Sequence, residues 1–193
     1  MNIYVHSQAA GERVLASITR LLERRLRLKV NRKKSAVAPV EERSFLGHRL
    51  SRGGRLGIAP KSLKRMKQRV RRITKRNRGI SLERMIVELN RFVSGWVTYF
   101  RYAAARSQLR RLDSWLRRRL RCVRLKQCKG FAATVRFLRR LGIWERPARL
   151  LASSGKGWWR KAVSRQAACG MSTTWLRGHG WTPLVERFDA LQH

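Results

Sequence analysis

The stretch that decides the fold, residues 60–102, reads PKSLKRMKQRVRRITKRNRGISLERMIVELNRFVSGWVTYFRY. Its apolar residues recur at three- and four-residue steps, which is the spacing of one face of an α-helix. Pro60 suits the first turn of such a helix, and Gly79 is the residue expected to end it. Ser81 is a good N-cap for a second helix. The residues expected on the buried stripes are Leu63, Met66, Val70 and Ile73 in the first helix and Leu82, Met85, Leu89, Val93, Trp96 and Phe100 in the second.

Helical patterns also dominate the chain after residue 102. A third amphipathic helix is predicted from about Ser107 to Arg124. Three such helices with short links can pack as a compact bundle. Shorter helices, broken by glycine and proline, are predicted at 131–141, 158–168 and 184–191. The inward residues of the third helix are Leu109, Leu112, Trp115, Leu116, Leu120 and Val123.

The part before Pro60 has a different pattern. Residues 2–6 predict a short strand and residues 28–30 a second one, whereas 9–27 predict an amphipathic helix and 31–35 a polar turn. Residues 44–50 and 55–58 predict a hairpin, because their connector contains the glycines that a tight turn requires. The predicted fold class is therefore mostly α. It combines a small α+β piece at 1–58, a three-helix bundle at 59–129 and a helical extension at 130–193.

The charge of the chain indicates a polyanionic partner. There are 47 Lys and Arg against 10 Asp and Glu, a formal net charge of +37. Such a charge destabilises a compact state through self-repulsion unless a polyanion neutralises it. A membrane surface is the main alternative partner for a basic chain. No apolar run approaches the ~20 residues of a membrane span. Seven Trp and 43% hydrophobic residues argue against a disordered tail.

Cationic residues are densest on the first and third predicted helices. No acid interrupts the run from Trp115 to Lys129, so neighbours one turn apart repel each other. A solvated face is the alternative to a phosphate-binding one, and the excess of Arg over Lys does not decide RNA over DNA. Tyr99 and Tyr102 could stack on bases, whereas Trp96 and Phe100 suit the core. The predicted RNA-binding residues are Lys64, Lys67, Arg71, Arg72, Lys75, Arg76, Arg117, Arg118, Arg119, Arg121, Arg124, Lys126 and Lys129.

Residues that could carry chemistry are scattered. No pair of carboxylates has a spacing that suits two-metal phosphoryl transfer, and no histidine has a companion at ligand spacing. The three cysteines, Cys122, Cys128 and Cys169, form no CxxC pair, so we read them as reduced, mostly buried thiols of a cytoplasmic protein. The first eight residues lack the pattern of a signal peptide. The sequence predicts no catalytic residue, no metal and no cofactor.

Several separated motifs resemble the C-terminal half of group II intron-encoded reverse transcriptase/maturases, in the order of that family. Residues 2–37 resemble the stretch after its catalytic Tyr-Ala-Asp-Asp box. SFLGHRL at 44–50 resembles its primer grip. GISLERMIVELNRFVSGWVTYFRY at 79–102 and LDSWLRRRLRCVRLKQCK at 112–129 resemble its maturase-specific region, the thumb or domain X. LLASSGKGWWRKA at 150–162 and LVERFDALQ at 184–192 resemble its tail.

The resemblance implies the end of a reverse-transcriptase palm at 1–58, a thumb or X domain at 59–129 and a C-terminal extension at 130–193. It also implies primer-grip-like roles for Phe45, Leu46 and Gly47, and places Lys34 where the family has a palm lysine near the nucleotide. The catalytic aspartates of the family, however, precede the position of Met1. We therefore expect no polymerase activity from this chain by itself.

Three functions remain open on the sequence. The first is an RNA-binding maturase fragment that binds structured group II intron RNA and assists splicing or mobility. The second is the C-terminal piece of a split RNA-directed DNA polymerase, with a separately encoded N-terminal half as its partner. The third is a remnant without present function. All three are expected in the cytoplasm, without a membrane partner.

Overall fold

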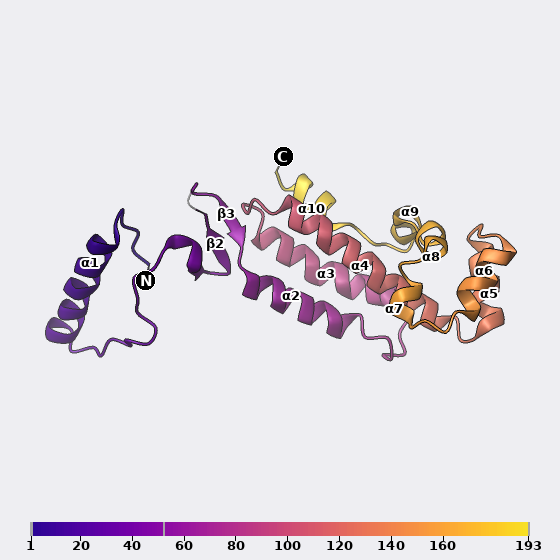
Figure 1. Ribbon diagram of the computed structural model, residues 1–193, viewed down its shortest axis with the longest axis horizontal. Coiled ribbons are helices and arrows are strands. Elements are labelled where there is room, and N and C mark those ends of the chain that lie inside the picture. The colour runs from indigo at the N-terminus through magenta and orange to yellow at the C-terminus, as the bar shows by residue number, and fades with distance from the viewer. Residues whose placement is uncertain (1, 52, 193) are drawn as a thin grey trace. The chain divides into compact units, whose positions relative to one another are not determined.

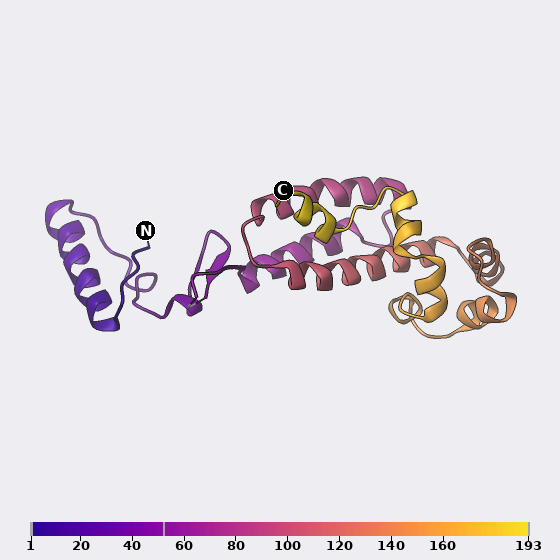
Figure 2. The same ribbon diagram turned by 90° about the horizontal axis from the view of Figure 1, so that it is seen from above.

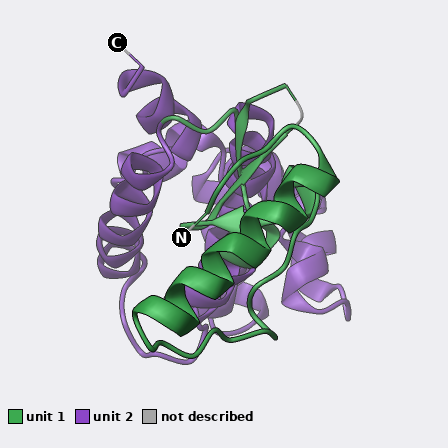
Figure 3. Ribbon diagram, turned by 90° about the vertical axis from the view of Figure 1, so that its left-hand side faces the viewer, with its two compact units in different colours: residues 1–62, 102–104 green, residues 63–101, 105–193 purple. Residues whose placement is uncertain are grey.

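The computed structural model describes residues 2–51 and 53–192 and is mostly helical (Figures 1 and 2). The chain divides into two compact units (Figure 3). Unit 1 comprises residues 1–62 and 102–104, and unit 2 comprises residues 63–101 and 105–193. The predicted fold class, mostly α with a small α+β part, is confirmed.

Unit 1 combines one helix with a small sheet. Ser7 caps helix α1 (Gln8–Arg20) by accepting the Ala10 N–H, and the helix continues into a π-helical turn, η1 (Leu21–Arg25). A 3₁₀ turn, η2 (Val40–Glu42), precedes three antiparallel strands, β1 (Ser44–Phe45), β2 (His48–Leu50) and β3 (Leu56–Ile58), in the order β1-β2-β3. The predicted hairpin is thus β2–β3. The sequence reading missed a second tight turn at Leu46–Gly47, where both residues have positive φ, 49° and 78°.

The strands predicted at 2–6 and 28–30 are wrong. In the residues that the structure describes, neither segment belongs to the sheet. Val5 packs on helix α1 instead: a Cβ placed on Gly11 would lie 3.3 Å from Val5 Cγ2 and 2.7 Å from Val37 Cγ1. Tyr4 stays 62% exposed. β-branched and aromatic residues therefore gave a strand pattern to a segment that has no strand to pair with.

Unit 2 is built on a helical bundle. Helices α2 (Pro60–Ile73), α3 (Leu82–Tyr99) and α4 (Arg106–Gln127) run side by side, and the short helix α10 (Leu184–Ala190) packs on α3 and α4 (Figures 1 and 2). Ser81 caps α3 as predicted, by accepting the Arg84 N–H. The fully buried side chains include Met66, Val70, Ile86, Leu89, Val93, Leu116 and Leu120.

Helix α2 ends at Ile73, six residues before the predicted stop at Gly79. Thr74 Oγ1 donates to the Val70 carbonyl at 2.7 Å, and Arg78 Nη1 donates to the Ile73 carbonyl at 2.7 Å. The Val70 carbonyl also accepts the Thr74 N–H, whereas Arg78 satisfies the Ile73 carbonyl, one of those that a helix leaves open at its C-terminus. Sequence periodicity does not register such contacts, and for this reason the predicted helix was too long.

Five short helices surround the C-terminal half of α4. They are α5 (Phe131–Arg140), α6 (Glu145–Ser153), α7 (Trp158–Lys161), α8 (Arg165–Gly170) and α9 (Thr173–Gly178). The helix predicted at 158–168 is in fact two, because Ser164 caps α8 by accepting the Ala167 N–H. Helices α6 and α9 were not predicted. A second hydrophobic core lies between the C-terminal part of α4 and the helices that follow it. Its buried residues are Cys122, Leu125, Cys128, Val135, Phe137, Leu138, Ala148, Leu151, Ala162, Ala167 and Met171.

Candidate nucleic-acid interface

Helix α2 presents an exposed cationic face. Met66, Val70 and Ile73 turn one side of the helix into the core, and the helix contains no acidic residue. Of the predicted RNA-binding residues in this region, only Lys67 is half-buried. The exposed ones are Lys64, Arg71, Arg72, Lys75 and Arg76. Arg65 and Arg69 are exposed on the same helix but are not among the predicted residues. Their exposure could have been predicted from the helical period, which places them away from the apolar stripe.

The arginines of α4 are used differently. Arg119 is half-buried, and its Nε donates to Thr74 Oγ1 at 2.5 Å. Its Nη2 donates to the carbonyls of Thr74 at 3.2 Å and Arg71 at 3.4 Å. Arg119 therefore binds the C-terminal end of α2 to α4. Burial lowers the pKa of Arg119, and the nearby positive charges of Arg71 and Arg76 lower it further.

Arg121 and Arg118 join α4 to the helices of the second core. Arg121 Nε donates to the Met171 carbonyl at 2.8 Å and its Nη2 to the Ala168 carbonyl at 3.4 Å. Arg118 Nε donates to the Trp159 carbonyl at 2.9 Å, and its guanidinium lies 3.9 Å from the centre of the Trp159 ring. Both side chains thus hold neighbouring backbone in place.

The cations between residues 117 and 129 fall into a half-buried group and an exposed group. The Arg124 guanidinium lies 4.5 Å from the centre of the Phe137 ring, and Arg117 donates to the Ser114 hydroxyl at 3.0 Å. All five α4 arginines between 117 and 124 are half-buried, whereas Lys126 and Lys129 are exposed. The structure therefore separates the predicted RNA-binding residues into an exposed set and a set bound to the protein itself.

The acidic residues of unit 2 leave the α2 face uncompensated. Residues 63–193 contain 33 Lys and Arg but six acids. Asp113 is buried, and its two oxygens accept the N–H groups of Leu184 at 2.8 Å and Val185 at 3.1 Å. The exposed predicted cations of α2 make no ion pair with any residue that the structure describes. The other five acids are in the contacts Arg78–Glu88, Arg106–Asp189, Arg139–Glu145–Arg149, Arg177–Glu186 and His179–Glu83.

The aromatic cluster at the end of α3 is partly core and partly surface. Phe100 is buried, with its ring centre 4.8 Å from that of Trp96 and 4.8 Å from that of Tyr99. Trp96 is half-buried. Tyr99 and Tyr102 are 53% and 71% exposed. Base stacking by these two tyrosines stays a prediction.

The primer-grip-like residues of unit 1 form the tight turn between β1 and β2. The Gly47 carbonyl accepts the Ala59 N–H at 2.9 Å and the Ser62 hydroxyl at 3.1 Å, which ties the turn to the start of α2. Phe45 and Leu46 are 48% and 67% exposed. A primer-binding role for this turn stays a prediction.

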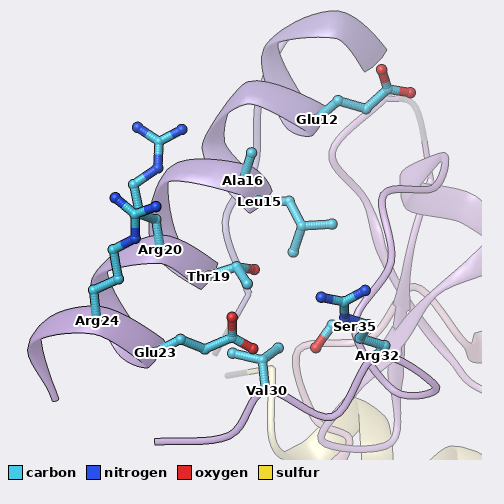
Figure 4. A pocket seen from close by; sticks show the side chains of 10 residues that line it. All are labelled: Glu12, Leu15, Ala16, Thr19, Arg20, Glu23, Arg24, Val30, Arg32 and Ser35. Atoms are coloured by element: carbon cyan, nitrogen blue, oxygen red, sulfur yellow. The ribbon is translucent and has the colours of Figure 1, made fainter. Parts of the chain in front are cut away.

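A groove of about 600 Å³ runs along helix α1 in the same unit (Figure 4). Leu15 and Glu23 point toward Val30 and Arg32 across it, whereas Arg20 and Arg24 point outward (Figure 4). Its lining mixes acid, base and apolar groups, so it favours no single ligand chemistry. Ser35, the neighbour of Lys34, also lines this groove.

Residues 63–142 match the family model of the group II intron maturase-specific domain. This part of the chain is a maturase-specific domain. The match includes α3, α4, α5 and α2 from residue 63, and so contains both the exposed α2 cations and the half-buried α4 arginines. A search of the curated proteins finds no match to the chain.

The residues that the structure describes contain no candidate metal site and no disulfide bond. No group of three or more His, Cys, Asp or Glu could hold a metal ion among the residues that the structure describes. All three cysteines are free thiols, and burial raises the pKa of Cys122 and Cys128, which favours their neutral form. Cys169 is exposed. In the described ranges, no helix has the length and apolarity needed to cross a membrane.

Proposed function

We propose that this chain binds structured group II intron RNA in the cytoplasm and stabilises the fold in which the intron splices. The observation that carries the proposal is the acid-free, exposed face of α2 within the maturase-specific domain. Cations that have no acid to pair with gain most from a phosphate backbone, because each contact releases condensed counterions. A protein that binds the folded RNA more tightly than misfolded forms shifts the population toward the folded one. The RNA then supplies the bond-making chemistry.

A charge-matched pair of variants tests the proposal. Four exposed cations of α2 and of the segment directly after it, Lys64, Arg71, Arg72 and Lys75, are changed to Gln in one variant. Four other exposed arginines of unit 2, Arg84, Arg91, Arg110 and Arg111, are changed to Gln in the other. Both variants lose the same formal charge, so general electrostatic attraction falls equally. Only the first removes the proposed phosphate contacts.

We expect the α2 variant to bind intron RNA about 10- to 1,000-fold more weakly at moderate salt, and the matched variant no more than about threefold more weakly. Each lost contact should reduce the slope of log affinity against log salt by about 0.7–0.9, so four reduce it by about 3. The measurement is a salt series of filter-binding isotherms, followed by splicing of the intron with each variant. Equal losses in the two variants would show that α2 is not the interface.

Unit 1 supports a second proposal, that a separately encoded reverse-transcriptase half binds this chain. Residues 2–5 form no helix and no part of the sheet, and Ile3, Tyr4 and Val5 are 48%, 62% and 40% exposed. Three neighbouring exposed apolar side chains, two of them β-branched, in a segment without a strand partner suit pairing with a strand from a partner chain. The test is RNA-directed DNA synthesis with and without a polypeptide that carries the aspartate box. Synthesis only in the mixture supports the split enzyme, and none in either sample contradicts it.

A further inference from the structure

A small cationic cavity lies where α2, α4 and α7 meet within unit 2. It has a volume of about 100 Å³ and is lined by Thr74, Arg76, Arg119, Cys122 and Trp159. One water takes about 30 Å³ of liquid, so the cavity has room for a group of a few heavy atoms, such as a phosphate. Two of its lining residues are arginines, and none is acidic. The cavity therefore favours an anion.

The polar groups in the lining leave donors available. Arg119 uses Nε and Nη2 to bind the end of α2, and its Nη1 makes no hydrogen bond in the part of the chain that the structure describes. Arg76 is exposed and likewise makes none there. The Cys122 thiol donates to the Trp158 carbonyl at 3.3 Å, so it does not compete for an anion.

Charge around the cavity is uncompensated. Helices α2 and α7 contain no acid, and Asp113, which is the acid of α4, binds backbone N–H groups at the start of α10. Arg71 and Arg119 both lie near the Trp115 ring, at 5.8 and 5.5 Å from its centre. The guanidinium groups of this cluster repel one another, which a bound anion would relieve.

Trp159 adds an aromatic surface to the cavity. The Arg118 guanidinium covers one face of its ring at 3.9 Å and also fixes its backbone carbonyl. The residue nevertheless stays 40% exposed. An indole that is held in place on one side and accessible elsewhere suits stacking of a nucleobase, because little conformational freedom remains to be lost on binding.

We propose that this site binds one unpaired nucleotide of the RNA, with its phosphate between Arg76 and Arg119 Nη1 and its base stacked on Trp159. The inference rests on the proposed RNA binding and adds a specific contact to it. Paired regions of an RNA would use the α2 face through phosphates alone, whereas this site requires a base that is free of its partner. The site thus selects single-stranded segments such as loops and bulges.

The test combines variants of the full chain with modified RNA. A single-stranded oligoribonucleotide is compared with one of the same length that carries abasic residues, which keeps the phosphates and removes the bases. The variants are Trp159→Leu, Trp159→Phe and, as a matched control, Trp144→Leu, whose indole is 84% exposed and lies outside the cavity. Affinity is measured by fluorescence anisotropy.

We expect Trp159→Leu to lose about 5- to 100-fold in affinity for the normal RNA, which is the usual effect of removing one stacked base contact. Its affinity for abasic RNA should equal that of the wild type. Trp159→Phe should keep most of the affinity, and Trp144→Leu should change it by less than about twofold. Arg76→Gln should reduce the salt slope by about 0.7 on both RNAs, because it removes one phosphate contact.

Two results overturn the inference without touching the proposed function. One is equal affinity of the wild type and Trp159→Leu for normal RNA. The other is an equal loss by Trp159→Leu on normal and abasic RNA, which would mean that the indole only holds α7 against α4. If the wild type binds neither RNA nor the intact intron, the proposed function itself fails.

Discussion

Helices α2 and α4 of the maturase-specific domain have similar charge in the sequence and opposite uses in the structure. The α2 cations Lys64, Arg71 and Arg72 are exposed and have no acid partner in the described residues. The five arginines of α4 between 117 and 124 are half-buried, and Arg119 and Arg121 donate to carbonyls of other segments of the chain. A run of positive charge can therefore form an exposed cationic surface or a set of side chains bound to the backbone of the same protein.

The difference follows from what surrounds each helix. Helix α4 lies among α3, α10 and the helices of the second core, and its Arg118, Arg119 and Arg121 reach the backbone of other segments. Helix ends leave carbonyls without partners, and a guanidinium can satisfy two of them at once. Helix α2 has the core on one side only. Its long cations on the other side meet no such carbonyls.

The difference between the two helices should have its largest measurable effect on the stability of variants. We expect Arg119→Gln and Arg121→Gln each to lower the free energy of unfolding by about 2 kcal/mol, because each leaves buried or half-buried carbonyls without a charged donor. Arg72→Gln, on the exposed face of α2, should change it by less than about 0.5 kcal/mol. Urea unfolding followed by circular dichroism measures all three.

RNA affinity should show the reverse order for Arg72→Gln and Arg121→Gln. Arg72→Gln should weaken binding at a temperature where every variant is folded, and Arg121→Gln should bind as the wild type does. A stable Arg121→Gln variant with weakened RNA binding would return α4 to the predicted interface and remove the distinction between the two helices.

Some of these structural features could be predicted from the sequence and others could not. The bundle, the N-cap of α3 and the hairpin were predictable, because Ser81 and the stripe at Met66, Val70 and Ile73 are local signals. The role of Arg119 was not, because its acceptors at residues 71 and 74 lie more than 40 positions away in the chain. The Trp159 cavity was missed for the same reason. The strand expected at 2–6 failed because pairing depends on a partner that local composition does not contain.

Asp113 is the one acidic residue of α4, and its replacement should have an intermediate effect on the free energy of unfolding. Its carboxylate accepts two N–H groups at the start of α10, and burial raises its pKa although these hydrogen bonds oppose the change. Asp113→Asn keeps the shape but replaces one acceptor by an NH₂ group that faces a donor. We expect a loss of about 1–2 kcal/mol in unfolding free energy and release of α10 before the bundle melts. Hydrogen exchange at Leu184 and Val185 measures that release, and unchanged protection would contradict it.

The smallest expected effect concerns the ion pair that follows α2. Arg78 donates to both carboxylate oxygens of Glu88 on α3, at 2.7 and 3.1 Å, and to the Ile73 carbonyl. These hydrogen bonds are the main cause that holds the pKa of Glu88 below its ordinary value. A carboxylate of this kind adds stability above its unfolded pKa, and that contribution is lost as pH falls through the lower folded pKa.

Glu88→Gln should therefore melt at a slightly lower temperature than the wild type at about pH 7, and the gap in melting temperature should close as the pH falls through the lowered pKa of Glu88. Because the pair is exposed, added salt should also reduce the gap. The control is Arg78→Gln, in which a further Glu88→Gln change should have little additional effect at any pH. A gap that stays constant with pH would mean that Glu88 acts through packing. The end of α2 would then be held by Arg119 from α4 rather than by this exposed pair.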